Sequence, residues 1–486
     1  MSITRHLARH AVERPNAPAL TCAGETLTYA ALDALVTRCA TRFAHAPAGG
    51  IGLDLPNGAA LAILFLAAAR AGREAQILDP GWPDSQRRDV LERVRPGLIV
   101  SGKAGDIRLA PGQGAAGLAE AIGADAAAAI PEPAADLPFY VGFTSGSTGL
   151  PKGYRRAHHS WTSSFDADTA EFGLGAEDVI LAPGALTHSL FLYALARGLD
   201  AGAHVLLSPS FRPRSAAELA RAHGATVLYG VPTQIALLLD HLAAEGETLP
   251  GLRLVLCSGA KWPPGRRQML GHLMPNADFA EFYGASELSF VTVAKEAEGV
   301  PAGSVGRAFA GVRLSIRDAA GRRLPPGRTG RVFVASPFLF MDYATGDSPD
   351  LFVSGDEVSV GDMGFLDAAG FLHLAGRSRR MIVTSGKNLF PEEVERVLET
   401  HPAIAAAAVL GVADGKRGER LVAFLSLAEG EAPARADLIG FLKSRLPLFK
   451  VPRLYARVAD WPLTPTGKTD FPAIATLWPA RCELLP

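Results

Sequence analysis

The sequence predicts an α/β protein with a large N-terminal domain of parallel sheets covered by helices, a small β subdomain, and a small α+β C-terminal domain. From Leu27 to Cys257, short apolar runs alternate with helical patterns, which is typical of parallel strands covered on both faces. From Ser304 to Tyr343, short alternating runs are broken by Pro and Gly, which predicts antiparallel strands. At 486 residues the chain is too long for one ordinary core. We expect domains at 1–376, with the β subdomain at about 300–376, and at 377–486.

Composition indicates a folded soluble enzyme, with 48% hydrophobic and 20% charged residues. A formal net charge of -1 argues against a nucleic-acid partner, because no basic excess is present to neutralise phosphates. No apolar run reaches the roughly 20 residues that span a bilayer. The N-terminal 18 residues carry charges throughout and lack a signal-peptide core, so we expect a cytoplasmic protein. Its four scattered cysteines fit reduced thiols: Cys22, Cys39, Cys257 and Cys482.

The first elements follow from apolar spacing. Leu27 to Ala44 predicts a helix with Thr28 as its N-cap. Ile51 to Pro56 predicts a buried strand and Ala59 to Ala71 a small-residue helix, before another strand that stops at Asp79. The stretch from Ala110 to Asp136 is rich in Ala, Gly and Pro, which indicates a surface connection between two subdomains.

The same alternation continues in the second half of the large domain. A helix is predicted from Ala157 to Phe172, and another around Leu190 to Leu199. The predicted strands are Val179 to Ala182, His204 to Ser208, Thr226 to Tyr229, and Leu252 to Cys257. Turns at the carboxyl ends of such strands are where α/β sheets bind ligands.

Phe143 to Gly153, FTSGSTGLPKG, is the most specific segment of the chain and predicts a loop that wraps an anion. Its three glycines permit successive N–H groups to converge on one point. Thr144, Ser145, Ser147 and Thr148 add hydroxyl donors and Lys152 adds a charge, which together suit a polyphosphate. The common phosphate-loop pattern with Gly-Lys-Ser/Thr does not fit. A Ser/Gly linker is the alternative, but linkers seldom emerge from a buried strand.

Phe282 to Glu287, FYGASE, is the second signal. Tyr283 offers a flat face to an adenine ring, and Gly284 allows a sharp turn. Glu287 offers the hard oxygen that Mg²⁺ takes together with phosphate ligands.

These two motifs, in this order, resemble those of the adenylate-forming superfamily, which includes acyl-CoA synthetases, stand-alone adenylation domains and luciferases. The resemblance implies ATP, Mg²⁺ and a carboxylic acid as reactants, with CoA as the acceptor. It also implies a C-terminal domain that is mobile and rotates between the two half-reactions.

The resemblance also implies roles for residues of the large domain. The loop residues Ser145, Gly146, Ser147, Thr148, Gly149 and Lys152 would hold the β- and γ-phosphates of ATP. Thr144 and Glu287 would act in catalysis and hold the metal. Gly259, Ala260, Tyr283, Gly284, Ala285 and Ser286 would line the adenylate. Lys261, beside them, is either solvated or faces an acidic substrate group.

Further roles fall in the last part of the chain. Asp362, expected in a turn, would bind the ribose hydroxyls, and Arg377 would reach the ribose or phosphate. Arg379 stands at the hinge where relatives carry Asp or Lys. Gly386 and Lys387 would belong to the loop that meets the pantetheine tunnel of CoA ligases. Lys468, in PLTPTGKTD, would contact the carboxylate and the α-phosphate, whereas a solvated surface lysine is the alternative.

The substrate is less defined. His188 begins an apolar helix, where it is either a structural residue or borders an acyl pocket with Phe191 and Phe290. No acidic residue occurs between Gly184 and Arg197, which disfavours an amino-acid substrate, because nothing there would neutralise an ammonium group. The leading hypothesis is an AMP-forming acyl-CoA synthetase, with a homodimer as the expected assembly if the chain associates. The alternatives are transfer to the pantetheine of a carrier protein, and a non-catalytic adenylate-binding protein.

Overall fold

The computed structural model of the chain describes all residues except 111, 125–126, 145–150, 263, 347, 385–386, 415–417, 429–431, 465–467, 479–482 and 486. The chain divides into two compact units. The first comprises Met1–Leu314 and Val334–Val358, and the second Ser315–Phe333 and Ser359–Pro486. The predicted domain boundary at 376/377 remains a prediction.

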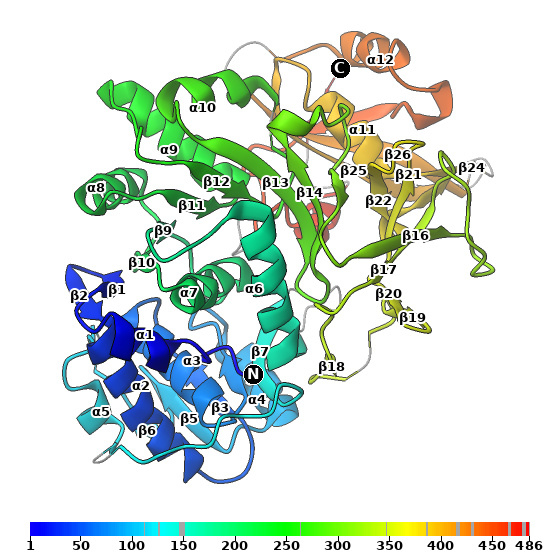
Figure 1. The fold of residues 1–486 in the computed structure, drawn as a ribbon. Helices are drawn as coiled ribbons and strands as arrows, with labels where there is room; N and C mark the ends of the chain where they lie inside the picture. The colour runs from blue at the N-terminus through cyan, green and yellow to red at the C-terminus, as the bar shows by residue number, and fades with distance from the viewer. Residues whose placement is uncertain are drawn as a thin grey trace. The chain divides into compact units, whose positions relative to one another are not determined.

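A nine-stranded sheet forms one half of the first unit (Figure 1). Its strands lie in the order β15-β14-β13-β12-β11-β9-β10-β1-β2. Neighbours from β1 to β13 are parallel, and β2, β14 and β15 pair in antiparallel fashion at the two edges. The bounds are β1 (Pro18–Cys22), β2 (Glu25–Thr28), β9 (Val179–Ala182), β10 (His204–Leu207), β11 (Val227–Gly230), β12 (Leu254–Cys257), β13 (Asp278–Ala285), β14 (Ser289–Lys295) and β15 (Arg307–Ala308).

A seven-stranded sheet forms the other half, in the order β18-β8-β7-β4-β3-β5-β6. Strands β3, β4, β5, β6 and β7 pair in parallel, whereas β8 and β18 continue the sheet in antiparallel fashion. The bounds are β3 (Ile51–Asp54), β4 (Ala75–Ile77), β5 (Leu98–Ser101), β6 (Ile107–Arg108), β7 (Pro138–Thr144), β8 (Lys152–Ala157) and β18 (Asp342–Tyr343).

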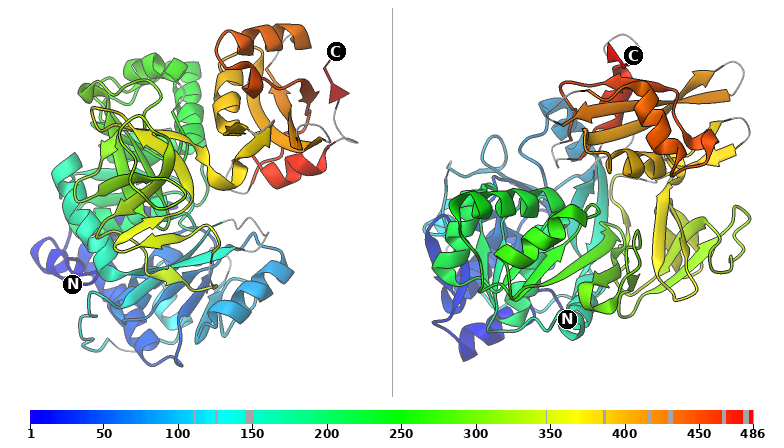
Figure 2. Two further views of the ribbon diagram at one scale, coloured as in Figure 1. Left: turned by 90° about the vertical axis from the view of Figure 1, so that its right-hand side faces the viewer. Right: turned by 90° about the horizontal axis from the view of Figure 1, so that it is seen from above.

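Helices separate and cover these sheets. The apolar helix α3 (Ala59–Arg70) contacts β3, β4 and β7 of one sheet, and it also contacts α7 (Ser189–Ala201), which packs on β9, β10 and β11 of the other. Figures 1 and 2 show the blue N-terminal segments beside the green segments of the nine-stranded sheet. The opposite face of that sheet packs against α8 (Pro213–His223), α9 (Pro232–Glu245) and α10 (Arg267–Leu273) in one core of leucine, alanine and aromatic side chains.

Further helices of the first unit are α1 (Leu7–Glu13), α2 (Tyr29–Ala44), α4 (Asp84–Val94), α5 (Leu118–Ala121) and α6 (His158–Phe172). Thr28 caps α2 as predicted, because its side chain accepts a hydrogen bond from the Ala31 N–H. The short strands β19 (Phe352–Ser354) and β20 (Glu357–Ser359) follow β18.

The second unit contains strands of two β-sheets. Strand β17 (Gly330–Ala335) lies at the boundary: Val334 pairs with Val358 in the first unit, and Gly330 pairs with Gly364 in the second. Strand β16 (Arg313–Arg317) pairs with β17, and β21 (Asp362–Leu366) pairs with β22 (Leu372–Arg377).

The rest of the second unit is an α+β fold around β26 (Gly418–Leu427). This strand pairs with β23 (Ile382–Thr384), β25 (Ile404–Asp414) and β27 (Leu454–Arg457), and β24 (Lys387–Leu389) and β28 (Glu483–Leu484) complete the sheet. Helices α11 (Pro391–Leu398) and α12 (Arg435–Lys443) share one core with the sheet, and α13 (Phe471–Thr476) belongs to another.

The predicted alternation of strands and helices is confirmed in the described residues, with ends that shift by one or two positions. The expectation for Phe143 to Gly153 was wrong in part: the segment is not wholly a loop, because Phe143 and Thr144 end β7 while Lys152 and Gly153 begin β8. The hairpin pairs Thr144 with Lys152.

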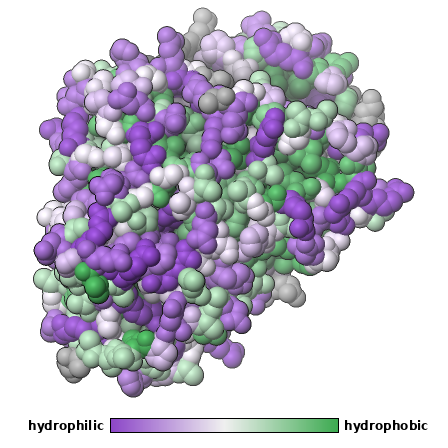
Figure 3. Space-filling model, in the orientation of Figure 1, coloured by the Kyte–Doolittle hydropathy of each residue, from purple (hydrophilic) through white to green (hydrophobic). Residues whose placement is uncertain are grey.

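Several chain-wide properties agree with the composition. Within the described ranges, no helix combines the length and the apolar character needed to cross a bilayer. Cys22, Cys39 and Cys257 are buried free thiols. The face of the molecule in Figure 3 intersperses hydrophilic side chains with hydrophobic areas.

A buried ion pair joins α6 to α7. Arg197 Nε donates to Asp168 Oδ1 at 2.8 Å, with the two side chains 1% and 0% exposed. Arg197 also donates to Thr169 Oγ1 and to the Leu174 carbonyl, so its charge is well compensated. Removal of one partner would leave the other buried and uncompensated.

We therefore expect Arg197→Met to lower the free energy of unfolding by about 3–5 kcal/mol. Chemical denaturation would measure the change. The exposed Arg214–Glu218 pair on α8 provides the control, since Arg214→Met should cost less than about 1 kcal/mol. Equal losses in the two variants would contradict a special role for the buried pair.

Candidate functional site

The turn that carries Glu287 joins β13 to β14. The Leu288 N–H donates to the Ala285 carbonyl at 3.0 Å, and Ser289 takes a positive φ of 62°. Gly284 lies at a register shift in this hairpin, opposite Phe290. A Cβ at Gly284 would overlap the Ser289 carbonyl oxygen, so the tight turn requires glycine at this position.

A tyrosine holds the Glu287 carboxylate. Glu287 is 8% exposed, and Tyr343 of β18 donates its hydroxyl to Glu287 Oε1 at 2.8 Å. The Phe340 N–H binds the Glu287 carbonyl at 2.8 Å. Burial, and then the charge of Glu287, raise the pKa of Tyr343, so this hydroxyl remains a hydrogen-bond donor at all ordinary pH values.

Lys152 lies at the same tyrosine. Its Nζ is 5.9 Å from the centroid of the Tyr343 ring, and it donates to Ser348 Oγ at 2.7 Å and to Asp350 Oδ2 at 3.2 Å. The structure thus brings Lys152 and Glu287 together around Tyr343. Thr144, paired with Lys152, ends the adjacent strand. The predicted loop residues Ser145, Gly146, Ser147, Thr148 and Gly149 lie outside the described residues.

The predicted adenine segment lies at the carboxyl ends of neighbouring strands. Ser258, Gly259 and Ala260 follow β12, which pairs in parallel with β13, and Ser258 Oγ donates to the Phe282 carbonyl at 3.0 Å. Gly259 has φ 97° and is exposed, as is Ala260. Tyr283, Gly284, Ala285 and Ser286 are all partly exposed at the end of β13. Lys261 is directed to protein groups, because its Nζ donates to the Ser304 carbonyl and lies 3.3 Å from Glu281.

The predicted acyl segment begins α7. His188 is the N-cap residue of this helix, and the next residue, Ser189, places its hydroxyl 3.5 Å from the Ser286 hydroxyl. Phe191 is buried against Gly184, where a Cβ would overlap the ring. Phe290 is also buried, and its ring stacks on Phe309 with centroids 4.6 Å apart.

In the second unit, the structure brings Asp362, Arg377 and Lys468 together. Asp362 begins β21, which corrects the expected turn position, and it pairs across the strands with Arg377. Arg377 Nε donates to Asp362 Oδ1 at 3.0 Å. Lys468 is exposed when its whole surface is considered. Burial of its charged end, and then the charge of Arg377, lower the pKa of Lys468, whereas the charge of Asp362 raises it.

The remaining predicted residues also fall in this unit. Arg379 is exposed within a short 3-10 turn, Ser378–Arg380. The neighbouring Arg380 binds Glu392 and Glu395 and stacks on the Phe471 ring. Lys387 begins β24, and Gly386 lies outside the described residues.

The donor set around Glu287 fits Mg²⁺ bound jointly with a nucleotide. Across the described ranges, no cluster of three or more His, Cys, Asp or Glu side chains could hold a metal by itself. Magnesium usually takes one or two carboxylates together with substrate phosphates and water. A carboxylate offers several acceptor sites, so Glu287 can bind a cation while it accepts the Tyr343 hydrogen bond.

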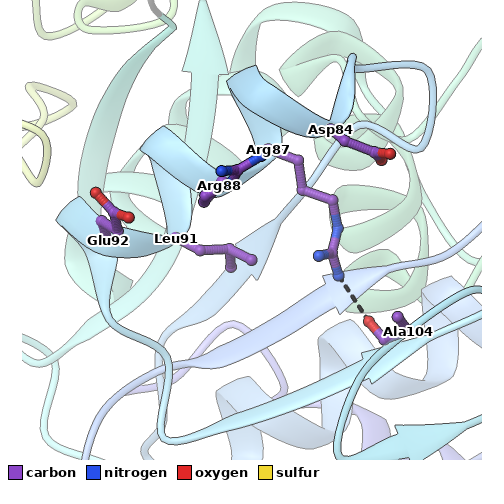
Figure 4. A pocket seen from close by; sticks show the side chains of 6 residues that line it. All are labelled: Asp84, Arg87, Arg88, Leu91, Glu92 and Ala104. Carbon is purple, nitrogen blue, oxygen red and sulfur yellow. Dashed lines mark hydrogen bonds between the residues drawn. The ribbon is translucent and has the colours of Figure 1, made fainter.

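A pocket of about 560 Å³ lies elsewhere, along α4 (Figure 4). Arg87 crosses it, donating to Asp54 Oδ2 and to the Ala104 carbonyl, each at 2.8 Å. Its lining residues are Asp84, Arg87, Arg88, Leu91, Glu92 and Ala104, none of which the motifs predicted.

Tyr343, Asp350 and Arg156 contribute to the site but were missed from the sequence. Tyr343 and Asp350 lie nearly 200 residues after Lys152 and belong to no motif. Arg156 is buried behind the Glu287 turn, stands beside another arginine in the sequence, and belongs to none of the predicted motifs. Only the alternation along β8, which begins at Lys152, could have indicated its burial.

The fold and this arrangement define a nucleotide-dependent enzyme, and the chain belongs to the AMP-binding enzyme family. Residues 7–344 match the AMP-binding enzyme domain, and residues 393–468 match the C-terminal domain of AMP-binding enzymes. The predicted superfamily, the predicted fold class and the predicted enzyme class, an AMP-forming acid–thiol ligase, are confirmed.

Individual relatives cover almost the whole chain. An uncharacterized acyl-CoA ligase, YhfT of Bacillus subtilis, is 37% identical over 477 residues, which is 96% of each chain. The fatty acid–[acyl-carrier-protein] ligase ScoC of Streptomyces coeruleorubidus is 30% identical over 94% of this chain and 93% of its own. The ATP-bound MatB of Rhodopseudomonas palustris shares the fold with a TM-score of 0.86, at 24% identity over 99% of this chain and 100% of its own.

The Glu287 turn gives a direct test of the site. We expect Gly284→Ala to reduce acid-dependent release of pyrophosphate from ATP by at least about tenfold. The added Cβ would overlap the Ser289 carbonyl oxygen and shift the turn that orients Glu287. Gly271→Ala on α10 is the matched control, since a Cβ there meets open space. If Gly284→Ala folds and retains full activity, the turn does not position a functional group.

Proposed function

We propose that the chain activates a carboxylic acid with ATP, releases pyrophosphate, and transfers the acyl group from the acyl-adenylate to the thiol of CoA. One observation in particular supports this proposal. Tyr343 contacts both Lys152, at the end of the predicted phosphate loop, and Glu287, the predicted metal ligand. Two motifs that lie far apart in the sequence therefore meet in space, as the binding of a nucleoside triphosphate with its metal ion would require.

The chemistry follows from the weakness of a carboxylate as an acyl donor. Attack of a carboxylate oxygen on the α-phosphorus of ATP forms a mixed anhydride and expels pyrophosphate. A thiolate then attacks the acyl carbon and expels AMP. Neither step needs a nucleophilic side chain of the protein, so the enzyme acts by positioning and by electrostatic stabilisation.

Each group has a defined task in this proposal. Lys468 contacts the substrate carboxylate and the α-phosphate, and Thr144 and Lys152 hold the phosphates. Glu287 would hold Mg²⁺, which supplies charge neutralisation at the phosphates. Tyr283 stacks on the adenine, Asp362 binds the ribose hydroxyls, and Arg377 reaches the ribose or phosphate. These tasks divide between the two units.

The acceptor has a second candidate. ScoC, at 30% identity, is a ligase that acts on an acyl carrier protein, so the pantetheine of a carrier protein is the alternative acceptor. Thioester formation with CoA and with a pantetheinylated carrier protein, compared at equal acid and ATP concentrations, separates the two. The acid itself is proposed to be an aryl or medium-chain acyl acid, since the segments around His188, Phe191 and Phe290 are apolar.

The activity is tested with a panel of carboxylic acids plus ATP, Mg²⁺ and CoA. We expect acid-dependent pyrophosphate release with at least one member. Lys468→Ala should abolish this release while ATP binding, measured by calorimetry, persists. Lys443→Ala, at the exposed end of α12, is the matched control and should keep full activity. If none of the acids in the panel supports pyrophosphate release, the proposed function is contradicted. If Lys468→Ala keeps full activity, the assignment of Lys468 to the site is contradicted.

Lys468 also predicts a pH dependence. Its pKa lies below the ordinary lysine value because of burial and then Arg377. The ammonium form needed for adenylation is therefore lost at a lower pH than in a free lysine, whose pKa is about 10.4. We expect the rate of pyrophosphate release to fall on an alkaline limb, and Lys468→Arg to remove that limb. An unchanged pH profile in Lys468→Arg would show that another group titrates.

A further inference from the structure

Strand β8 directs two adjacent arginines to opposite faces of its sheet. Arg155 is partly exposed and pairs with Glu74 and Asp342, each at 2.6 Å. Arg156 is only 2% exposed, which is rare for arginine. Alternation along the strand places Arg156 on the same face as Tyr154 and Lys152. This face is the one directed toward Tyr343, which pairs with Tyr154 across β8 and β18.

The guanidinium of Arg156 binds backbone on both sides of Glu287. Its Nε and Nη2 donate to the Ser286 carbonyl, at 3.1 and 2.5 Å. Its Nη1 donates to the Phe338 carbonyl at 2.7 Å and to Ser160 Oγ at 3.3 Å. Ser286 directly precedes Glu287, and Phe338 lies two residues before Phe340, whose N–H binds the Glu287 carbonyl. One side chain therefore fixes both segments that hold the Glu287 backbone.

A buried cation is costly, and its surroundings compensate the charge. Burial lowers the pKa of Arg156, whereas the tyrosines Tyr154 and Tyr140 and the carboxylate of Glu287 act in the opposite direction. The Tyr154 hydroxyl lies 2.8 Å from the Tyr140 hydroxyl and interacts with Ser189 and Ser286. A Cβ at Gly142 would overlap both tyrosine hydroxyl oxygens, so glycine leaves the space that this polar cluster occupies.

We propose that Arg156 is a positioning residue for adenylation, which orients the Ser286–Glu287 turn so that the Glu287 carboxylate faces the cation bound with the nucleotide. The inference rests on the proposed role of Glu287. Arg156 itself touches neither reactant, and its effect passes through two carbonyl groups. Methionine, which matches much of its volume, would leave both carbonyls without their donor.

The test compares Arg156→Met with Arg155→Met, its neighbour on the opposite face. Calorimetry measures ATP binding in Mg²⁺ and in EDTA, and a kinetic assay separates kcat from the KM of the acid. We expect Arg156→Met to reduce the Mg²⁺-dependent part of ATP affinity about 10- to 100-fold, as for supporting residues around metal ligands. Affinity in EDTA, and the KM of the acid, should stay near the wild-type values. Arg155→Met should behave as wild type in both measurements.

Equal Mg²⁺ dependence in the two methionine variants would overturn the proposal. If Arg156→Met does not fold, the same measurement is made on Arg156→Lys. A lysine ammonium keeps the charge but cannot bridge both carbonyls as a guanidinium does. A partial loss of Mg²⁺-dependent affinity supports the proposal, and wild-type affinity refutes it. Glu287→Gln distinguishes the role of Glu287 from that of Arg156. If Glu287→Gln keeps the Mg²⁺ dependence of ATP affinity, the proposed role of Glu287 is wrong. If Glu287→Gln loses this dependence but Arg156→Met keeps it, only the positioning role of Arg156 is wrong.

Discussion

The hydrogen bond from Tyr343 to Glu287 joins the two large sheets of the first unit at the point where the candidate site lies. Tyr343 belongs to β18 at the edge of the seven-stranded sheet, and Glu287 belongs to the turn between β13 and β14 of the nine-stranded sheet. Lys152 on β8 meets the same tyrosine ring. A donor from one sheet thus fixes the Glu287 carboxylate of the other, and the candidate site depends on this contact between the two sheets.

Much of the fold followed from the sequence because local patterns carry the information. Buried parallel strands leave short apolar runs, as in β9 and β12, and Thr28 marks a helix start by its hydroxyl. Gly284 and Glu287 could also be recognised, because a tight turn requires glycine and because Mg²⁺ prefers carboxylate oxygen together with phosphate. Arg156, Tyr343 and Asp350 could not, since their roles arise from strand pairing between distant segments. The position of Lys152 on a strand likewise depends on the β7–β8 register.

In the second unit, three charged side chains of the candidate site lie close to one another. Arg377 donates a hydrogen bond to Asp362, and both act on Lys468: burial and then the charge of Arg377 lower the pKa of Lys468, whereas the charge of Asp362 raises it. In the proposed function, these three residues supply an acceptor for the ribose hydroxyls and two cations for phosphate or carboxylate.

The burial of Arg156 has a consequence for how the β7–β8 hairpin assembles. Because side chains alternate along a strand, a one-residue slip would carry Arg156 to the outer face and force Arg155 inside, where Glu74 and Asp342 could not reach it. The slipped pairing would bury a guanidinium without its carbonyl acceptors. The adjacent arginines therefore favour one register of β7 and β8, the strands on either side of the predicted phosphate loop.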